Sequence, residues 1–114
     1  MNAIKACAVA LLGIVGASTS QTSSAQGPGW VYNLKVIRIV TVATGGVNVR
    51  FSPDITGCTS QSGYGAVFGS IYPNHAGINL MKADLLYAYA AGDYVSVYLS
   101  DNTCTITEMF LGQG

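Results

Sequence analysis

The chain has 114 residues, with five basic and five acidic side chains and a formal net charge of zero. Half of the residues are hydrophobic and only 9% are charged. A protein that binds nucleic acid needs a concentrated basic patch to neutralise phosphates, and this composition argues against that class. The length suits one small domain and does not suit two.

The first 25 residues have the pattern of a cleaved secretory signal peptide. Lys5 supplies a short basic region, residues 6–17 are apolar, and residues 18–25 are small and polar. A membrane-spanning helix needs about 20 apolar residues, and neither this run nor a later one reaches that length. We therefore expect an exported protein, periplasmic or secreted, without a membrane span. Its single domain would occupy residues 26–114, and cleavage after Ala17 is the alternative.

Two cysteines, Cys58 and Cys104, remain once Cys7 is removed with the signal. An even pair of cysteines in an exported chain predicts a disulfide. A metal site is the competing interpretation, but His75 is the only histidine and there is no Cys-x-x-Cys motif. We expect a Cys58–Cys104 disulfide, no metal and no other cofactor.

The domain begins with a predicted strand over residues 30–43, where β-branched and aromatic side chains dominate. Its apolar face changes sides near Arg38, which indicates a β-bulge. The glycine pair at residues 45–46 predicts a hairpin turn. Strict alternation of apolar and polar residues then predicts a second strand over residues 47–51.

A loop rich in glycine, serine and threonine follows at residues 52–63 and contains Cys58. Residues 64–72 predict a third strand, whose glycines permit sharp bending or close packing. The next connection, residues 73–77, contains His75, the one candidate for a histidine base. No carboxylate is adjacent to it in sequence, so we expect an exposed loop histidine and a protein that is not an enzyme.

Asn79 is predicted to cap a helix of about three turns, because its side chain can accept a backbone N–H and the next twelve residues contain neither glycine nor proline. Gly92 can adopt the left-handed conformation that ends it. Only Lys82 and Asp84 are charged, so we expect the helix to be covered on most sides. Its apolar stripe comprises Ile78, Met81, Leu85 and Tyr89, widened by Leu86 and Ala88.

Residues 94–100 predict a fourth strand, with valines and a leucine on its buried face and Tyr94, Ser96 and Tyr98 on the other. These three are the candidate ligand-binding residues, because outward tyrosines can stack on a sugar ring or fill a subunit interface. Packing beneath the helix or a loop is the structural alternative. A two-residue turn at Asp101-Asn102 then leads to a fifth strand over residues 103–110.

The predicted order is strand, strand, strand, helix, strand, strand. This order is that of the OB-fold, a five-stranded Greek-key barrel. We therefore predict a mainly β domain with one helix, folded as an OB-like barrel. An α+β sheet with one helix packed across it is the alternative.

Residues 85–98 read Leu-Leu-Tyr-Ala-Tyr-Ala-Ala-Gly-Asp-Tyr-Val-Ser-Val-Tyr. This run resembles the helix-to-strand region of B subunits of the subtilase-cytotoxin and typhoid-toxin type. Trp30 matches a tryptophan near the mature N-terminus of that family, and Cys58 matches a cysteine after its second strand. The chain lacks the longer C-terminal part and the second cysteine pair of those subunits. It is also similar to short exported bacterial proteins without an assigned role.

The resemblance implies an OB-fold that assembles as a ring pentamer and binds sialylated glycans. None of the family's sugar-contacting residues aligns onto a position of this chain. We therefore expect an exported, disulfide-linked binding module that self-associates and takes a glycan or protein partner. A periplasmic structural or accessory protein without a small ligand is the alternative function.

Overall fold

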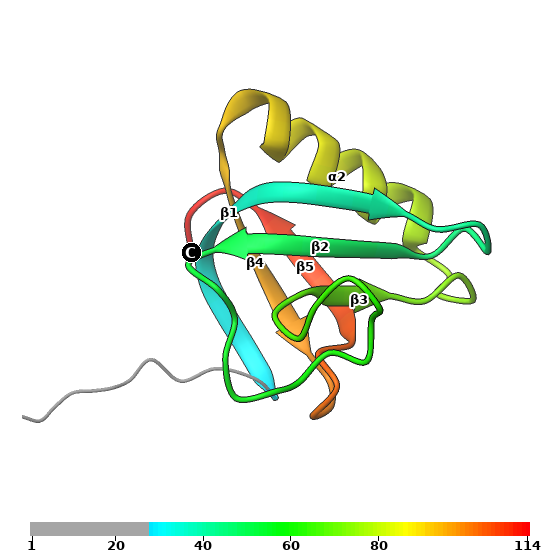
Figure 1. Ribbon diagram of the computed structural model, residues 1–114. Helices are drawn as coiled ribbons and strands as arrows, with labels where there is room; N and C mark the ends of the chain where they lie inside the picture. Colours follow the sequence, from blue (N-terminus) through cyan, green and yellow to red (C-terminus); the bar gives the residue numbers. More distant parts are fainter. Residues whose placement is uncertain (1–27) are drawn as a thin grey trace, which may run out of the picture.

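The computed structural model describes residues 28–114, so the expected signal peptide lies outside the described residues. The described chain is mainly β, with a five-stranded antiparallel sheet and one helix (Figure 1). The predicted order of strands and helix is confirmed. The elements are β1 (Gly29–Thr41), β2 (Val47–Ser52), β3 (Gly69–Ile71), α2 (Ile78–Ala91), β4 (Tyr94–Leu99) and β5 (Ile106–Leu111).

The strands are arranged in the order β3-β2-β1-β4-β5, with the long strand β1 at the centre. The first half of β1 pairs with β4 and the second half with β2, and Lys35 pairs with both Tyr94 and Ser52. The outer strands approach each other at one parallel bridge, between Ser70 and Thr105. This bridge does not close the sheet into a barrel. The structure therefore confirms the mainly β class but does not confirm the predicted OB-like barrel.

Two bulges bend β1. The predicted bulge near Arg38 is present, because the register with β2 shifts there and leaves Ile37 as an extra residue. A second bulge, which the sequence did not indicate, places Tyr32 and Asn33 opposite Ser96 of β4. Asn33 adopts a left-handed conformation with φ 59°, which asparagine tolerates better than most residues. The bulges bend β1 so that it pairs with β4 along its first half and with β2 along its second half.

The prediction of a third strand over residues 64–72 is wrong for its first five residues and for Tyr72. Only Gly69–Ile71 pair with β2, and the preceding residues form local turns. The N–H of Ser60 donates to the carbonyl of Ala66 at 2.9 Å, and the N–H of Phe68 donates to the carbonyl of Gly65 at 3.3 Å. These local hydrogen bonds satisfy backbone groups that a longer strand would have offered to β2.

Helix α2 begins at Ile78, and its N-cap is Gly77 without a side-chain cap, so the prediction of Asn79 as the cap is wrong. Gly92 ends the helix in the left-handed conformation, with φ 68°, as predicted. Among residues 28–114 no helix is long and apolar enough to span a membrane.

The expectation that α2 is covered on most sides is also wrong. Met81, Leu85 and Ala88 are its buried residues. Leu86 and Tyr89, assigned to the buried stripe from their spacing, are 63% and 54% exposed. The helix therefore packs through a narrow face and leaves large apolar side chains in solvent.

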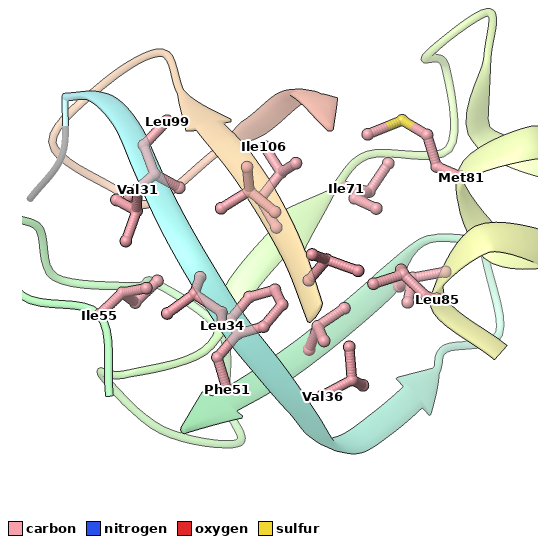
Figure 2. Close-up of a cluster of buried hydrophobic side chains, with 14 of the residues drawn as sticks. Val31, Leu34, Val36, Phe51, Ile55, Ile71, Met81, Leu85, Leu99 and Ile106 are labelled. Atoms are coloured by element: carbon pink, nitrogen blue, oxygen red, sulfur yellow. The ribbon is translucent and has the colours of Figure 1, made fainter. Parts of the chain in front are cut away.

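The core lies on the inner face of the sheet (Figure 2). Met81 and Leu85 of α2 close it at one end, and Ile55 from the loop after β2 closes it at the other. Its fully buried side chains are mainly aliphatic and come from strands far apart in the sequence. They include Leu34, Val47, Val49, Phe51, Ile71, Val95, Val97, Leu99 and Ile106.

The predicted disulfide is present. Cys58 and Cys104 are bonded with a Cα–Cα distance of 5.4 Å, and they lie 46 positions apart. Closing a loop of this length stabilises the folded state by about 4 kcal/mol in the chain-entropy model. The bond ties the loop after β2 to the connection before β5, and it is compatible with an exported protein, since disulfides persist in oxidising compartments.

The connection between β4 and β5 is longer than predicted. The carboxylate of Asp101 accepts hydrogen bonds from the backbone N–H and hydroxyl groups of both Thr103 and Thr105, at 2.8 to 3.2 Å. These bonds organise a turn, so regular pairing of β5 begins only at Ile106. Side chains of β5 also do not alternate regularly between the two faces, because a register shift makes Thr107 an extra residue.

We expect Gly69→Ala to destabilise the protein by about 1–3 kcal/mol through overpacking. A Cβ atom at Gly69 would lie 2.6 Å from Cδ1 and 3.1 Å from Cγ1 of Ile106, so the approach of β3 to β5 depends on the missing side chain. Urea unfolding measures the change. Ile106→Val removes the Cδ1 atom, and the double variant should lose less stability than the sum of the single variants. Strict additivity would contradict this contact.

Stability should fall in acid through Asp101. Desolvation raises the pKa of its carboxyl, but the hydrogen bonds from Thr103 and Thr105 outweigh this effect and hold the pKa below its ordinary value. A depressed pKa contributes stability that is present above the unfolded-state pKa and is lost as pH falls through the folded-state pKa. Asp101→Asn should therefore reduce the pH dependence of the unfolding free energy below about pH 4. Asp54→Asn is the control, and an unchanged acid slope in Asp101→Asn would contradict the prediction.

Candidate functional site

Four aromatic side chains gather on the outer face of the sheet and form what we call the aromatic cluster. Trp30 is its centre, with ring centroids 6.0 Å from Tyr32, 5.5 Å from Tyr98 and 5.4 Å from Phe110. Tyr32 and Phe110 are 6.2 Å apart. These separations lie in the range of stabilising aromatic pairs.

Strand pairing and the bulge of β1 at Tyr32 and Asn33 explain this arrangement. Trp30 is directly opposite Tyr98 in the β1–β4 ladder, and cross-strand neighbours of this kind interact side by side. Phe110 of β5 is paired with Ser96 of β4, one strand further from β1. The cluster therefore draws one or two side chains from each of three neighbouring strands, β1, β4 and β5.

The rim of the aromatic cluster is polar. Tyr32 is 53% exposed, whereas Trp30, Tyr98 and Phe110 are partly buried. Glu108 is exposed and directly opposite Tyr98 in the β4–β5 ladder. The side-chain oxygen of Asn33 accepts a hydrogen bond from the N–H of Gly114 at 3.0 Å, and Gly114 lies beside the rings of Phe110 and Tyr32. The site thus offers flat apolar rings beside a few polar groups.

The three residues singled out from the sequence lie in different surroundings. Tyr98 belongs to the aromatic cluster. Ser96 is fully buried, and its hydroxyl oxygen accepts a hydrogen bond from the N–H of Asn33 at 3.1 Å. Tyr94 lies apart from the cluster, with the Lys35 ammonium 4.1 Å from the centre of its ring.

Sequence reasoning did not include Trp30, Tyr32 or Phe110 among the candidate residues. The spacing of two between Trp30 and Tyr32 was a usable signal, because such residues share a face of a regular strand. Phe110 gave no comparable signal, since the register shift at Thr107 decides which face it occupies.

His75 is partly buried and is not the exposed loop histidine that we expected. Its Nδ1 accepts a hydrogen bond from the N–H of Gly77 at 2.9 Å, and its Nε2 lies 2.8 Å from the carbonyl oxygen of Thr107. Because Nδ1 accepts a hydrogen bond, Nε2 carries the proton and donates a hydrogen bond to that carbonyl. Both ring nitrogens therefore bond to backbone groups and link the N-terminus of α2 to the bulge of β5.

No group of three or more histidine, cysteine, aspartate or glutamate side chains that could hold a metal ion occurs within residues 28–114. The single ion pair of this region joins Arg50 and Asp54 at 3.1 Å, and both side chains are well exposed. An exposed pair of this kind contributes little to stability, about 0–1 kcal/mol.

A scan against protein-family models finds no match for this chain, and a search of curated proteins finds none. The assignment of a function therefore depends on the geometry of residues 28–114.

A double-mutant cycle should detect the contact between Trp30 and Tyr98. Trp30→Leu and Tyr98→Leu each remove one ring of an edge-to-face pair, and we expect a coupling energy of about 0.5–1.5 kcal/mol in urea unfolding. The pair Trp30→Leu and Tyr87→Leu is the control, because Tyr87 lies on α2. A coupling energy no larger than that of the control would contradict the contact.

Proposed function

We propose that this protein is an exported, non-catalytic binding module that takes a glycan on the aromatic cluster. The observation that carries the proposal is the set of four aromatic rings on one outer sheet face, with Tyr32 53% exposed at its side. Clusters of this kind on an outer face are not needed to fill the core, which lies on the opposite side of the sheet.

A sugar ring suits this surface chemically. Its C–H groups can stack on an aromatic face, and its hydroxyl groups can bond to tyrosine hydroxyls and to rim groups such as Asn33 and Glu108. The near-neutral charge of the chain offers little attraction to a polyphosphate. A neutral or weakly charged hydroxylated ligand is therefore the better match.

We also propose that the sheet is a partly open version of the OB-fold. The order of strands and helix supports this, as does the parallel bridge between Ser70 and Thr105 at the outer strands. OB-folds commonly bind oligosaccharides and oligonucleotides on the face of strands two and three. Here the aromatic cluster lies instead on β1, β4 and β5.

We also propose that the protein is exported and that it is related to the toxin B subunits. The Cys58–Cys104 disulfide supports export, and the resemblance of residues 85–98 to toxin B subunits supports glycan binding with self-association. A structural or accessory role in the periplasm is the second candidate. It is favoured by the partial burial of Trp30, Tyr98 and Phe110, because rings packed against each other also stabilise a sheet.

The test is binding of a panel of sialylated and neutral oligosaccharides, followed through the fluorescence of Trp30, the only tryptophan. We expect at least one glycan to bind, and Tyr32→Ala to weaken that binding about five- to tenfold through lost ring contact. Tyr87→Ala is the matched control, because Tyr87 is similarly exposed, at 56%, but lies on α2.

Two results would contradict the glycan proposal. One is the absence of any fluorescence or thermal response to the whole panel by protein whose unfolding is cooperative. The other is equal binding by wild type, Tyr32→Ala and Tyr87→Ala. Either result would leave the accessory role as the better account.

A further inference from the structure

A second surface, on the opposite half of β1 from the aromatic cluster, lies between β1 and α2. It is a groove of about 620 Å³, which we call the edge groove. Figure 1 shows α2 running alongside the second half of β1. Its lining residues are Ile37, Arg38, Ile39, Thr41, Lys82, Leu86 and Tyr89. This volume is typical of ligand-binding clefts.

One wall of the edge groove is an unpaired strand edge. The pairing of β1 with β4 ends at Lys35, whereas β1 continues to Thr41 beside β2. Within residues 28–114, the side of β1 that faces away from β2 therefore has no strand partner over residues 36–41. In an antiparallel pair, alternate residues direct their N–H and C=O groups away from the partner strand. Such an edge is a template for another strand.

The other wall is one face of α2. Lys82, Leu86 and Tyr89 follow spacings of four and three, which place them along one side of the helix. Leu86 is 63% exposed and Tyr89 54% exposed, and Ile37 across the groove is 47% exposed. Large apolar side chains left in solvent on both walls of one groove indicate a surface that a partner covers.

The charge of the edge groove is positive. Arg38 and Lys82 line it, and the single ion pair of residues 28–114 involves neither of them. Lys35, the nearest lysine of β1, is engaged elsewhere, since its ammonium donates to the carbonyl of Gly92. The two free cations of the groove therefore complement carboxylates.

We propose that the edge groove binds an extended peptide that pairs with residues 36–41 of β1 and alternates acidic with apolar side chains. Backbone pairing would supply affinity, and the apolar and basic walls would select the side chains, as in other cases of strand addition. An edge of this length takes a peptide of about five to seven residues. The peptide site is separate from the aromatic cluster and does not depend on glycan binding.

Two other occupants fit the groove less well. A lipid could use the apolar walls and the cations, but it would leave the N–H and C=O groups of the β1 edge without partners. A second copy of the chain, paired edge to edge, would bring Arg38 and Lys82 toward the same residues of its mate, and like charges placed together oppose association.

The first experiment uses two pools of seven-residue peptides, with valine, isoleucine, leucine or tyrosine at alternate positions. The residues between them are aspartate or glutamate in one pool and lysine in the other. We expect the acidic pool to bind in fluorescence anisotropy, and the basic pool to bind at least tenfold more weakly. N-methylation of the tightest acidic peptide should abolish binding at positions of one parity and spare it at the other, because only one parity faces β1.

Variants of the protein locate the site. Leu86→Asp should weaken binding of the acidic peptide about tenfold or more, whereas Leu80→Asp should not, although Leu80 is 76% exposed on the same helix. Reversing both groove cations, with Arg38→Glu and Lys82→Glu, should reverse the preference between the two pools. Tyr32→Ala should leave peptide binding unchanged, which separates this site from the aromatic cluster.

Four results would overturn the proposal. They are no binding of either pool, equal binding of all N-methylated peptides, a dimer that Leu86→Asp dissociates, and competition for the groove by vesicles of phosphatidylglycerol. The last two would assign the edge groove to a second copy and to a lipid surface, respectively.

Discussion

The fold depends on the point where β1 passes from one partner strand to the other. Lys35 is paired with Tyr94 of β4 on one side and with Ser52 of β2 on the other. Its ammonium donates to the carbonyl of Gly92 at the end of α2 and lies against the ring of Tyr94. One residue therefore joins the two halves of the sheet to the helix and to the start of β4. The helix end is a favourable place for this cation, because its last carbonyls carry partial negative charge.

This division of β1 separates the two candidate surfaces. The first half, backed by β4 and β5, presents aromatic rings on its outer face. The second half has only β2 beside it, so one edge faces α2 and the groove that lies between them. A shared inner core, closed at its ends by Ile55 and by Met81 and Leu85 (Figure 2), supports both surfaces. A ligand on one surface would thus contact a different part of β1 from a ligand on the other.

The even number of cysteines left after signal cleavage predicted the disulfide. The periodicity of apolar residues predicted the elements whose side chains alternate without interruption, such as Val95, Val97 and Leu99 in β4. Periodicity failed where one local hydrogen bond or one extra residue changes which face the following side chains occupy. The bonds to Asp101 shorten β5, and the extra Thr107 moves Phe110 to the outer face. It also failed on α2, where Leu86 and Tyr89 have helical spacing suited to a core but line the open groove beside β1. The aromatic cluster was therefore only partly visible in the sequence, through Tyr98 and the spacing of Trp30 and Tyr32, and the edge groove was not visible at all.

The bulges of β1 also determine which kinds of sequence change this domain can accept. A substitution at a bulge alters one side chain, whereas deletion of the extra residue restores regular pairing and removes the local bend and added twist. Deletion of Asn33 would leave Val31 and Leu34 opposite Val97 and Val95 but would straighten β1 where it passes from one partner strand to the other. Insertions should instead be accepted at the tip of the hairpin, residues 43–45, where the chain is mostly exposed and a longer loop can leave the pairing of Thr41 with Val47 unchanged. Length variation among natural versions of this domain should therefore be confined to its loops, and the length from Trp30 to Thr41 should be constant.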